Sequence, residues 1–215
     1  MKHLVVVTVC LTAALSAQAQ SGLPADYKGR PYDGKAQLVP GRVELAWYDL
    51  GGEGVAYHDA DSANHGSGEL NYQPSHCEAG VPDTICHFRQ DEGVDISYVK
   101  QLADFAKPNW FNPRLQQLYV GWEENGEWTN YTIDVKRPGT YAILVLYSFG
   151  ANAVALELNR KPAAECKLPI DTGSFHTWNK ARCGTIAFRD TGLQLLTMRY
   201  NKGNNLAYFE FIPEP

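Results

Sequence analysis

The chain has 215 residues, of which 44% are hydrophobic and 20% charged, and its formal net charge is −5. This length fits one sizeable domain, and the composition excludes an intrinsically disordered chain. No stripe of basic residues is visible, which argues against nucleic acid as a partner.

The N-terminal residues have the pattern of a secretory signal peptide. Lys2 and His3 precede an apolar run over residues 4–15, and Ala17-Gln18-Ala19 forms a small-x-small cleavage site. The apolar run is too short to cross a bilayer as a helix. We therefore expect residues 1–19 to be removed and the mature protein to be secreted or periplasmic, with no membrane as a partner.

The next segment, residues 20–38, is rich in Gly, Pro, Ser, Lys and Asp, and we interpret it as a linker or a loosely packed arm. From residue 39 to residue 215, short strand patterns alternate with Gly, Asn, Asp and Pro. This pattern predicts an all-β domain, either a sandwich or a barrel. The expected strands cover residues 42–49, 127–136, 140–149, 153–159, 185–189, 192–200 and 206–212.

One segment breaks the strand pattern. Residues 58–118 are polar and rich in Asn, His, Gly and Pro. Loops of this length inside a compact domain usually have a function or are held by their own contacts. We interpret the segment as an elaborated loop system at one end of the β-domain.

The chain has five cysteines, and Cys10 leaves with the signal peptide. An even number in an exported protein indicates disulfides. We expect the local pairs Cys77–Cys86 and Cys166–Cys183, because each pair brackets a stretch with loop composition. A zinc site is the alternative, but no Cys-x-x-Cys spacing supports it.

Aromatic residues outside the strand pattern point to a ligand site. A sugar ring has an apolar face of C–H bonds that stacks on a flat aromatic ring, while nearby amides and carboxylates bond its hydroxyl groups. The alternative interpretation is that these aromatic residues form small cores beneath long loops. The residues are Tyr57, Trp110, Phe111, Trp122, Phe175 and Trp178.

Four sequence blocks, taken in order, carry a family resemblance. They are Gly-Gly-Glu-Gly-Val-Ala-Tyr-His-Asp at 51–59, Asp-Glu-Gly-Val-Asp-Ile at 91–96, the Val-Gly-Trp block that opens 120–135, and Pro-Gly-Thr-Tyr at 138–141. Together they resemble family 6 carbohydrate-binding modules, over residues 39–211. The resemblance implies a β-sandwich (jelly roll) with long loops at one end, which holds a poly- or oligosaccharide without cleaving it.

The same resemblance implies particular binding residues. Trp122 follows the Val-Gly of its block, Phe175 follows Thr-Gly-Ser, and Asn205 opens an Asn-Leu-x-Tyr block. A sugar held between the two aromatic rings, with the asparagine bonding a hydroxyl, is the implied arrangement. Tyr57 is a further candidate contact. Trp128 and Tyr131 match family positions that pack inside.

Two departures from the family bear on metal binding. The family commonly holds a structural calcium, but the Glu-x-Glu pattern of the first strand is Glu44-Leu45-Ala46 here, and Ala207 replaces the closing Asp. Calcium needs six to eight oxygen ligands. We therefore expect no cofactor and an absent or weak calcium site. Asp59 and Asp61 are further calcium candidates, although their spacing departs from the EF-hand loop and Asx residues in loops usually bond their own backbone.

The second departure is the long insert at residues 66–117, which could reshape or cover the binding cleft. Two functional alternatives also remain. A small polysaccharide hydrolase or lyase would need two carboxylates across one bond, and an adhesion module would dock to a protein. We expect no enzyme; a separate glycan-degrading enzyme is a conceivable partner. The candidate carboxylates for catalysis are Asp91, Glu92, Asp95, Glu123, Glu124 and Glu127.

Overall fold

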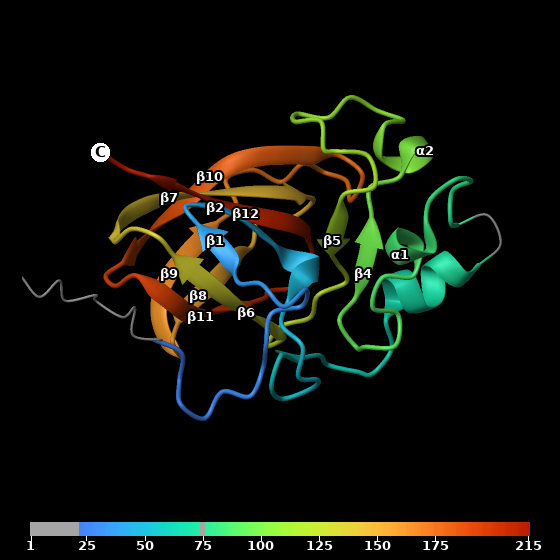
Figure 1. Cartoon of the computed structure of the whole chain (residues 1–215). Coiled ribbons are helices and arrows are strands. Elements are labelled where there is room, and N and C mark those ends of the chain that lie inside the picture. The colour runs from blue at the N-terminus through green and yellow to red at the C-terminus, as the bar shows by residue number, and fades with distance from the viewer. Residues whose placement is uncertain (1–21, 74–75) are drawn as a thin grey trace, which may run out of the picture.

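A computed structural model describes residues 22–73 and 76–215. The expected signal peptide lies outside the described residues. Two β-sheets pack face to face, and short helices lie at one side of them (Figure 1). The predicted all-β sandwich is confirmed. In the part of the chain that the structure describes, no helix has the length and apolar character needed to cross a membrane.

The first sheet has the strand order β1-β6-β11-β8-β9, and β3 pairs with β6 beside this path. β1 runs parallel to β6, and the other pairings are antiparallel. The strands are β1 (Gln37–Val39), β3 (Tyr57–His58), β6 (Trp128–Val135), β8 (Ala153–Leu158), β9 (Lys161–Lys167) and β11 (Gly192–Arg199).

The second sheet has the order β10-β7-β12-β5-β4, and β2 pairs with β12. All of these pairings are antiparallel. The strands are β2 (Gly41–Glu44), β4 (Ile96–Tyr98), β5 (Leu118–Val120), β7 (Gly139–Ser148), β10 (Trp178–Phe188) and β12 (Asn205–Pro213).

The main core lies between the sheets, where the alternation in β6 is confirmed: Tyr131 and Ile133 are fully buried in it. β7 is buried on both faces because a second, smaller core covers the outer face of its sheet. In β7, Tyr147 faces the main core, while its neighbour Leu146 packs with Trp178 and Tyr208 in the second core. The second core lies under the insert.

The insert is a series of short elements rather than one open loop. They are held by hydrogen bonds and by one strand pairing, β4 with β5. Figure 1 shows α1 and α2 at one side of the sandwich. The elements are the π-helical turn η2 (His65–Glu69), the 3₁₀ turn η3 (Leu70–Tyr72), α1 (Asp83–Cys86) and α2 (Gln101–Asp104).

Residues 22–38 form an arm that lies against the first sheet. Arg30 exchanges backbone hydrogen bonds with Leu50, and the Tyr27 hydroxyl donates to Asp49 at 2.7 Å. The arm ends in β1, which is paired with β6.

The strand predictions were incomplete in several places. The short strands β1, β3, β4 and β5 lie outside the predicted strands. β9 was missed because Lys161-Pro162-Ala163-Ala164 has low β-propensity; the strand lies at a sheet edge, where proline is tolerated. β10 begins at Trp178, whereas the sequence predicted a strand only from residue 185. The prediction missed its first half because the register shifts between Arg182 and Gly184, where the regular alternation is interrupted. The first expected strand is cut short by a 3₁₀ turn, η1 (Leu45–Trp47).

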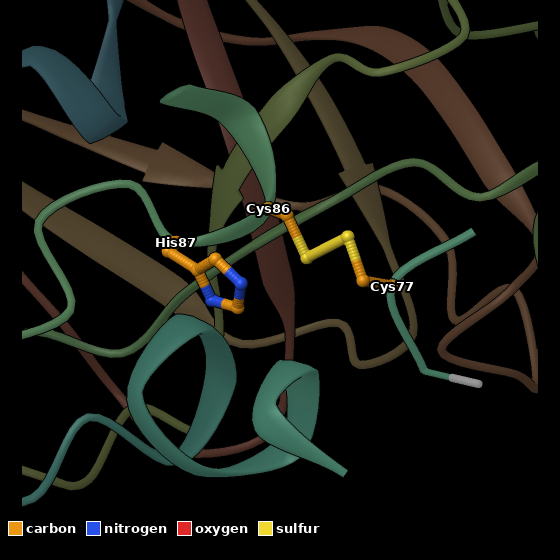
Figure 2. A group of neighbouring side chains, drawn as sticks. All are labelled: Cys77, Cys86 and His87. Carbon is orange, nitrogen blue, oxygen red and sulfur yellow. A yellow bond between two sulfur atoms is a disulfide. The ribbon is translucent and has the colours of Figure 1, made fainter. Parts of the chain in front are cut away.

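Both predicted disulfides are confirmed. Cys77 and Cys86 are joined within the insert (Figure 2), with their Cα atoms 5.8 Å apart. Cys166 and Cys183 are joined with Cα atoms 4.6 Å apart, but they lie in β9 and β10 rather than around a loop. The second bond therefore connects the edge strands of the two sheets.

The disulfide between the sheets gives a first prediction. Replacing both Cys166 and Cys183 by Ala should lower the free energy of unfolding by about 3 kcal/mol, because the crosslink restricts the unfolded chain. Urea unfolding followed by tryptophan fluorescence measures the change. Non-reducing peptide mapping of the wild-type protein is the control, and free thiols at both positions would contradict the assignment.

Candidate functional site

Two exposed aromatic rings stand at the end of the sandwich where the resemblance places a ligand. Trp122 is 42% exposed and follows β5, while Phe175 is 44% exposed and precedes β10. Between their loops lies Asn205, the first residue of β12, which is only 4% exposed. The structure therefore brings together three residues that are distant in sequence.

Hydrogen bonds and close packing explain how Asn205 connects the two loops. Its Nδ2 donates to the backbone oxygen of Phe175 and to the Oγ of Ser148, both at 3.1 Å. On the other side, a Cβ atom at Gly121 would lie 2.5 Å from Asn205 Oδ1, so a larger residue at position 121 would clash. The glycine lets the Trp122 loop approach the asparagine closely.

The backbone of Trp122 is strained. Its φ of 58° lies in the left-handed region, which costs a non-glycine residue roughly 1–2 kcal/mol. Such strain persists where the surrounding structure enforces it, and it concentrates at functional sites. The turn is held because Gly121 N donates to the backbone oxygen of Asp95 at 3.0 Å.

Phe175 is supported by a second aromatic ring that the sequence analysis missed. The rings of Phe149 and Phe175 have centroids 4.2 Å apart and are tilted by 40°. Phe149 N donates to Thr172 Oγ1, and Ser148 Oγ donates to the backbone oxygen of Phe175, both at 2.7 Å. Phe149 directly follows β7, so its sequence position gives no sign of this role.

The insert holds the far side of the Phe175 loop through Asp104. This carboxylate is buried and accepts a hydrogen bond from Trp178 Nε1 at 2.8 Å. It also accepts one from Lys100 N at 2.7 Å and lies 3.1 Å from His176 Nδ1. His176, half exposed and next to Phe175, is thereby placed at the edge of the aromatic surface. Neither Asp104 nor His176 was identified from the sequence.

A pocket of about 510 Å³ opens beside Trp122. The strand end near β5 forms one side of it, and the η2 region of the insert forms another. Its lining includes Trp122, His65 and six carboxylates. The carboxylates belong to Asp59, Asp61, Glu69, Asp95, Glu124 and Glu127.

The carboxylates of this pocket are crowded and partly buried. Burial, together with the charges of Glu127 and Asp61, raises the pKa of Asp59 to about 7. Burial, with the charge of Asp59, raises the pKa of Asp95 to about 7. His65 lies between Asp61, at 3.2 Å, and Glu69, at 2.7 Å, and these hydrogen bonds raise the pKa of its imidazole to about 9.

Other candidate carboxylates lie elsewhere. Glu92 forms an ion pair with Arg89 at 2.8 Å, and Asp91 is exposed outside the pocket. Glu123 is 2% exposed, and neither of its carboxyl oxygens has a hydrogen-bond partner among the described residues. Burial raises the pKa of Glu123 well above its usual value, and the charges of Glu127 and Asp95 raise it further.

The structure does not support Tyr57 as a sugar contact. Its side chain is buried, its ring packs edge-on against Tyr48 at 5.4 Å, and its hydroxyl accepts a hydrogen bond from Gly93 N. Tyr131 is in the core as predicted, but Trp128 is only half buried and lines a separate hollow on the first sheet.

The weak metal candidates lie apart from one another. Glu44 accepts a hydrogen bond from Gln117 Nε2 at 2.7 Å, whereas Asp59 and Asp61 line the pocket. Among the described residues, one group of three or more potential ligands has its atoms within 4.8 Å of one another, and it consists of Cys77, Cys86 and His87 (Figure 2). Its two sulfurs are bonded to each other, so they are not free thiolates that could bind zinc.

Comparisons with known proteins gave structural matches only. No family model matches the chain, and no curated protein matches it. The chain is similar to a module from Clostridium stercorarium in complex with cellobiose, at 12% identity over 84% of this chain and 99% of that one, with a TM-score of 0.47. A β-1,3-glucan-binding family 6 module from Bacillus halodurans matches at 11% identity over 83% and 99% of the two chains, with a TM-score of 0.45.

A third similar structure is the carbohydrate-binding module from Cellvibrio mixtus lichenase 5A in complex with cellotriose. It is 18% identical over 46% of this chain and 79% of that one, with a TM-score of 0.40. Family 6 carbohydrate-binding modules, which the sequence blocks resemble, are therefore also found among the structures similar to this chain.

Glu123 gives a prediction about pH and stability. Because its folded-state pKa is raised, the folded state retains a proton that the unfolded state loses above a pH of about 4.3. Stability should therefore fall as the pH rises above that value, by up to about 1.4 kcal/mol per pH unit from this group. Glu123→Gln should flatten the pH dependence in urea unfolding between about pH 5 and pH 7. The exposed Glu165→Gln is the control, and an equal slope in all three proteins would contradict the prediction.

The metal candidates give a prediction about calcium. We expect a chelator to shift the melting temperature by less than about 2 °C, since a ligand stabilises a protein only as far as it binds the folded state. Differential scanning calorimetry with and without chelator measures the shift. A loss of several degrees would show that other oxygens hold a structural ion.

Proposed function

We propose that this is an exported, non-catalytic carbohydrate-binding protein that holds a poly- or oligosaccharide between Trp122 and Phe175. One observation carries the proposal: two loops, each with an exposed aromatic residue, meet at a buried asparagine that is hydrogen-bonded to one loop and packed against the other. Two disulfides in one chain support an oxidising, extracytoplasmic environment.

The chemistry of the surface suits a sugar. The C–H face of a pyranose ring would stack on Trp122 or Phe175, and burial of that apolar face would stabilise the complex. Both Nδ2 bonds of Asn205 are directed to protein acceptors, which leaves Oδ1 to accept a hydrogen bond from a sugar hydroxyl. Ordered aromatic rings and a fixed amide lose little conformational entropy on binding.

The insert borders this surface and covers neither ring. It contributes Asp104 on the Phe175 side and the η2 wall on the Trp122 side, and both aromatic rings stay exposed. An extended glycan would therefore have room to run along the surface.

A glycan hydrolase is the second candidate, and the carboxylates beside Trp122 favour it. Asp59 and Asp95 line one pocket and have raised pKa values, as a general acid requires. We prefer binding without cleavage, because stacking of a sugar on Trp122 and Phe175 would account for recognition of the glycan without a catalytic carboxylate.

Substitution of the aromatic residues tests the binding site. Trp122→Ala and Phe175→Ala should each weaken glycan binding by about ten- to a hundredfold, because each removes stacking area worth roughly 1–3 kcal/mol. Asn205→Ala should cost a similar amount, since it also removes the bond that holds the Phe175 loop. Isothermal titration calorimetry with a ligand chosen from a glycan array measures each loss.

The matched control is Trp47→Ala, because Trp47 is 39% exposed and lies in η1, outside the site. It should leave affinity unchanged. Unaltered affinity in Trp122→Ala would refute the proposed site. Release of shortened products from a bound glycan would instead favour the hydrolase.

A further inference from the structure

We infer that the insert adds a third stacking residue, Trp110, to the proposed sugar site, so that the preferred ligand is a long polysaccharide chain rather than a short oligosaccharide. The inference rests on the proposed function, because it extends the surface of Trp122 and Phe175 beyond Phe175. Three features carry it: the exposure of the Trp110 indole, the hydrogen bonds that hold its backbone, and its position beside the Phe175 loop.

Trp110 has a large aromatic side chain that lies outside both cores. The residue is 57% exposed, more than Trp122 or Phe175, and it belongs to neither of the two hydrophobic clusters of the described residues. A tryptophan that serves a core buries its apolar surface, as the fully buried Trp178 does. The Trp110 indole is therefore free to stack on the ring of a ligand.

The backbone that carries this exposed side chain is held by several hydrogen bonds. The N of Trp110 and the N of Phe111 both donate to the backbone oxygen of Trp178, each at 3.0 Å. Directly before them, Asn109 Oδ1 accepts a hydrogen bond from Trp178 N, and Asn109 Nδ2 donates to the backbone oxygen of Asp104, both at 2.8 Å. An aromatic residue on a segment held in this way loses little conformational entropy when a ligand binds.

The same bonds place Trp110 beside the Phe175 loop. Trp178 is the first residue of β10 and follows Phe175 closely in the chain; the three-residue step between them spans at most about 11 Å. Figure 1 shows the green segment after α2 beside the start of β10, where the Trp110 backbone is bonded to Trp178. A glycan chain stacked on Phe175 can therefore reach the Trp110 indole within a few sugar units.

His176 supplies a polar group between Phe175 and the Trp110 segment. Its side chain is 52% exposed, and its Nδ1 lies 3.1 Å from Asp104 Oδ1. Because the carboxylate accepts, Nδ1 of the neutral imidazole carries the hydrogen, and Nε2 is left to accept a hydrogen bond from a sugar hydroxyl. Aromatic rings with a polar group between them suit a chain of sugars, which presents both C–H faces and hydroxyl groups.

A comparison of chain lengths tests the inference. The probes are the dimer and the hexamer of the glycan that binds most tightly on an array that includes β-1,4- and β-1,3-linked glucose oligomers. The dimer is too short to cover Trp122, Phe175 and Trp110 together, whereas the hexamer is long enough to add Trp110. Isothermal titration calorimetry should show the hexamer binding at least about tenfold tighter, because one more aromatic ring is buried against it.

Variants of Trp110 localise the effect. Trp110→Ala should weaken binding of the hexamer by about tenfold and keep the affinity for the dimer within about twofold. This substitution retains the backbone N–H that bonds Trp178, so the segment should stay in place, and a melting temperature near that of the wild type checks this. Trp110→Tyr keeps a flat ring and should restore most of the affinity for the hexamer. The matched control is Trp47→Ala, another exposed tryptophan, which should leave both affinities unchanged.

The outcomes separate this inference from the proposed function. Loss of dimer and hexamer binding in Trp122→Ala, with no effect of Trp110→Ala on either, would overturn the role of Trp110 and leave the sugar site intact. Equal affinity of the wild-type protein for the two lengths, or an equal loss of both in Trp110→Ala, would overturn the preference for long chains. Failure of every glycan on the array to bind would overturn both proposals.

Discussion

The buried amide of Asn205 is the contact on which the proposed binding surface depends. It stands at the start of β12, where the loops after β5 and before β10 meet. Other contacts hold each loop separately, such as Ser148 Oγ to the Phe175 backbone oxygen and Gly121 N to the Asp95 backbone oxygen. Asn205 contacts both loops and so connects one to the other. A buried amide whose donors are satisfied holds such a connection in place, because leaving them unsatisfied would be costly. Gly121 completes the arrangement, since only a residue without a Cβ fits against the asparagine.

The insert contacts the proposed binding surface at both ends, and its contribution differs between the Phe175 end and the Trp122 end. On the Phe175 side, Asp104 ties the insert to Trp178 and His176 and so stiffens the loop. On the Trp122 side, the η2 region closes a pocket of crowded carboxylates. Burial, and after it the charges of neighbouring carboxylates, raises the pKa values of Asp59 and Asp95. The insert supplies two of the six carboxylates, Glu69 and Asp95, and the others come from the chain on either side of it.

The sequence was sufficient for the sandwich, because alternation in β6 and apolar runs in β7 reflect burial directly. It was not sufficient for β9, where edge position overrides low propensity. The pair Cys166–Cys183 was predicted correctly, but its place between the edge strands of two sheets was not, because the packing of two sheets is not a local property. Trp122, Phe175 and Asn205 were proposed as binding residues through block resemblance, and the structure brings their loops together. Phe149, Asp104 and His176 were missed, because their roles arise from contacts between distant segments. Tyr57 was chosen because it falls outside the predicted strands, but it lies in β3 and its buried ring packs against Tyr48.

A crystal structure of the protein with a bound oligosaccharide tests the central claim most directly. Our account predicts a sugar ring stacked on Trp122 and held between it and Phe175, with a hydroxyl donating to Asn205 Oδ1. A glycan seated instead in the hollow of the first sheet at Trp128 and Arg199, with the surface around Asn205 empty, would contradict it.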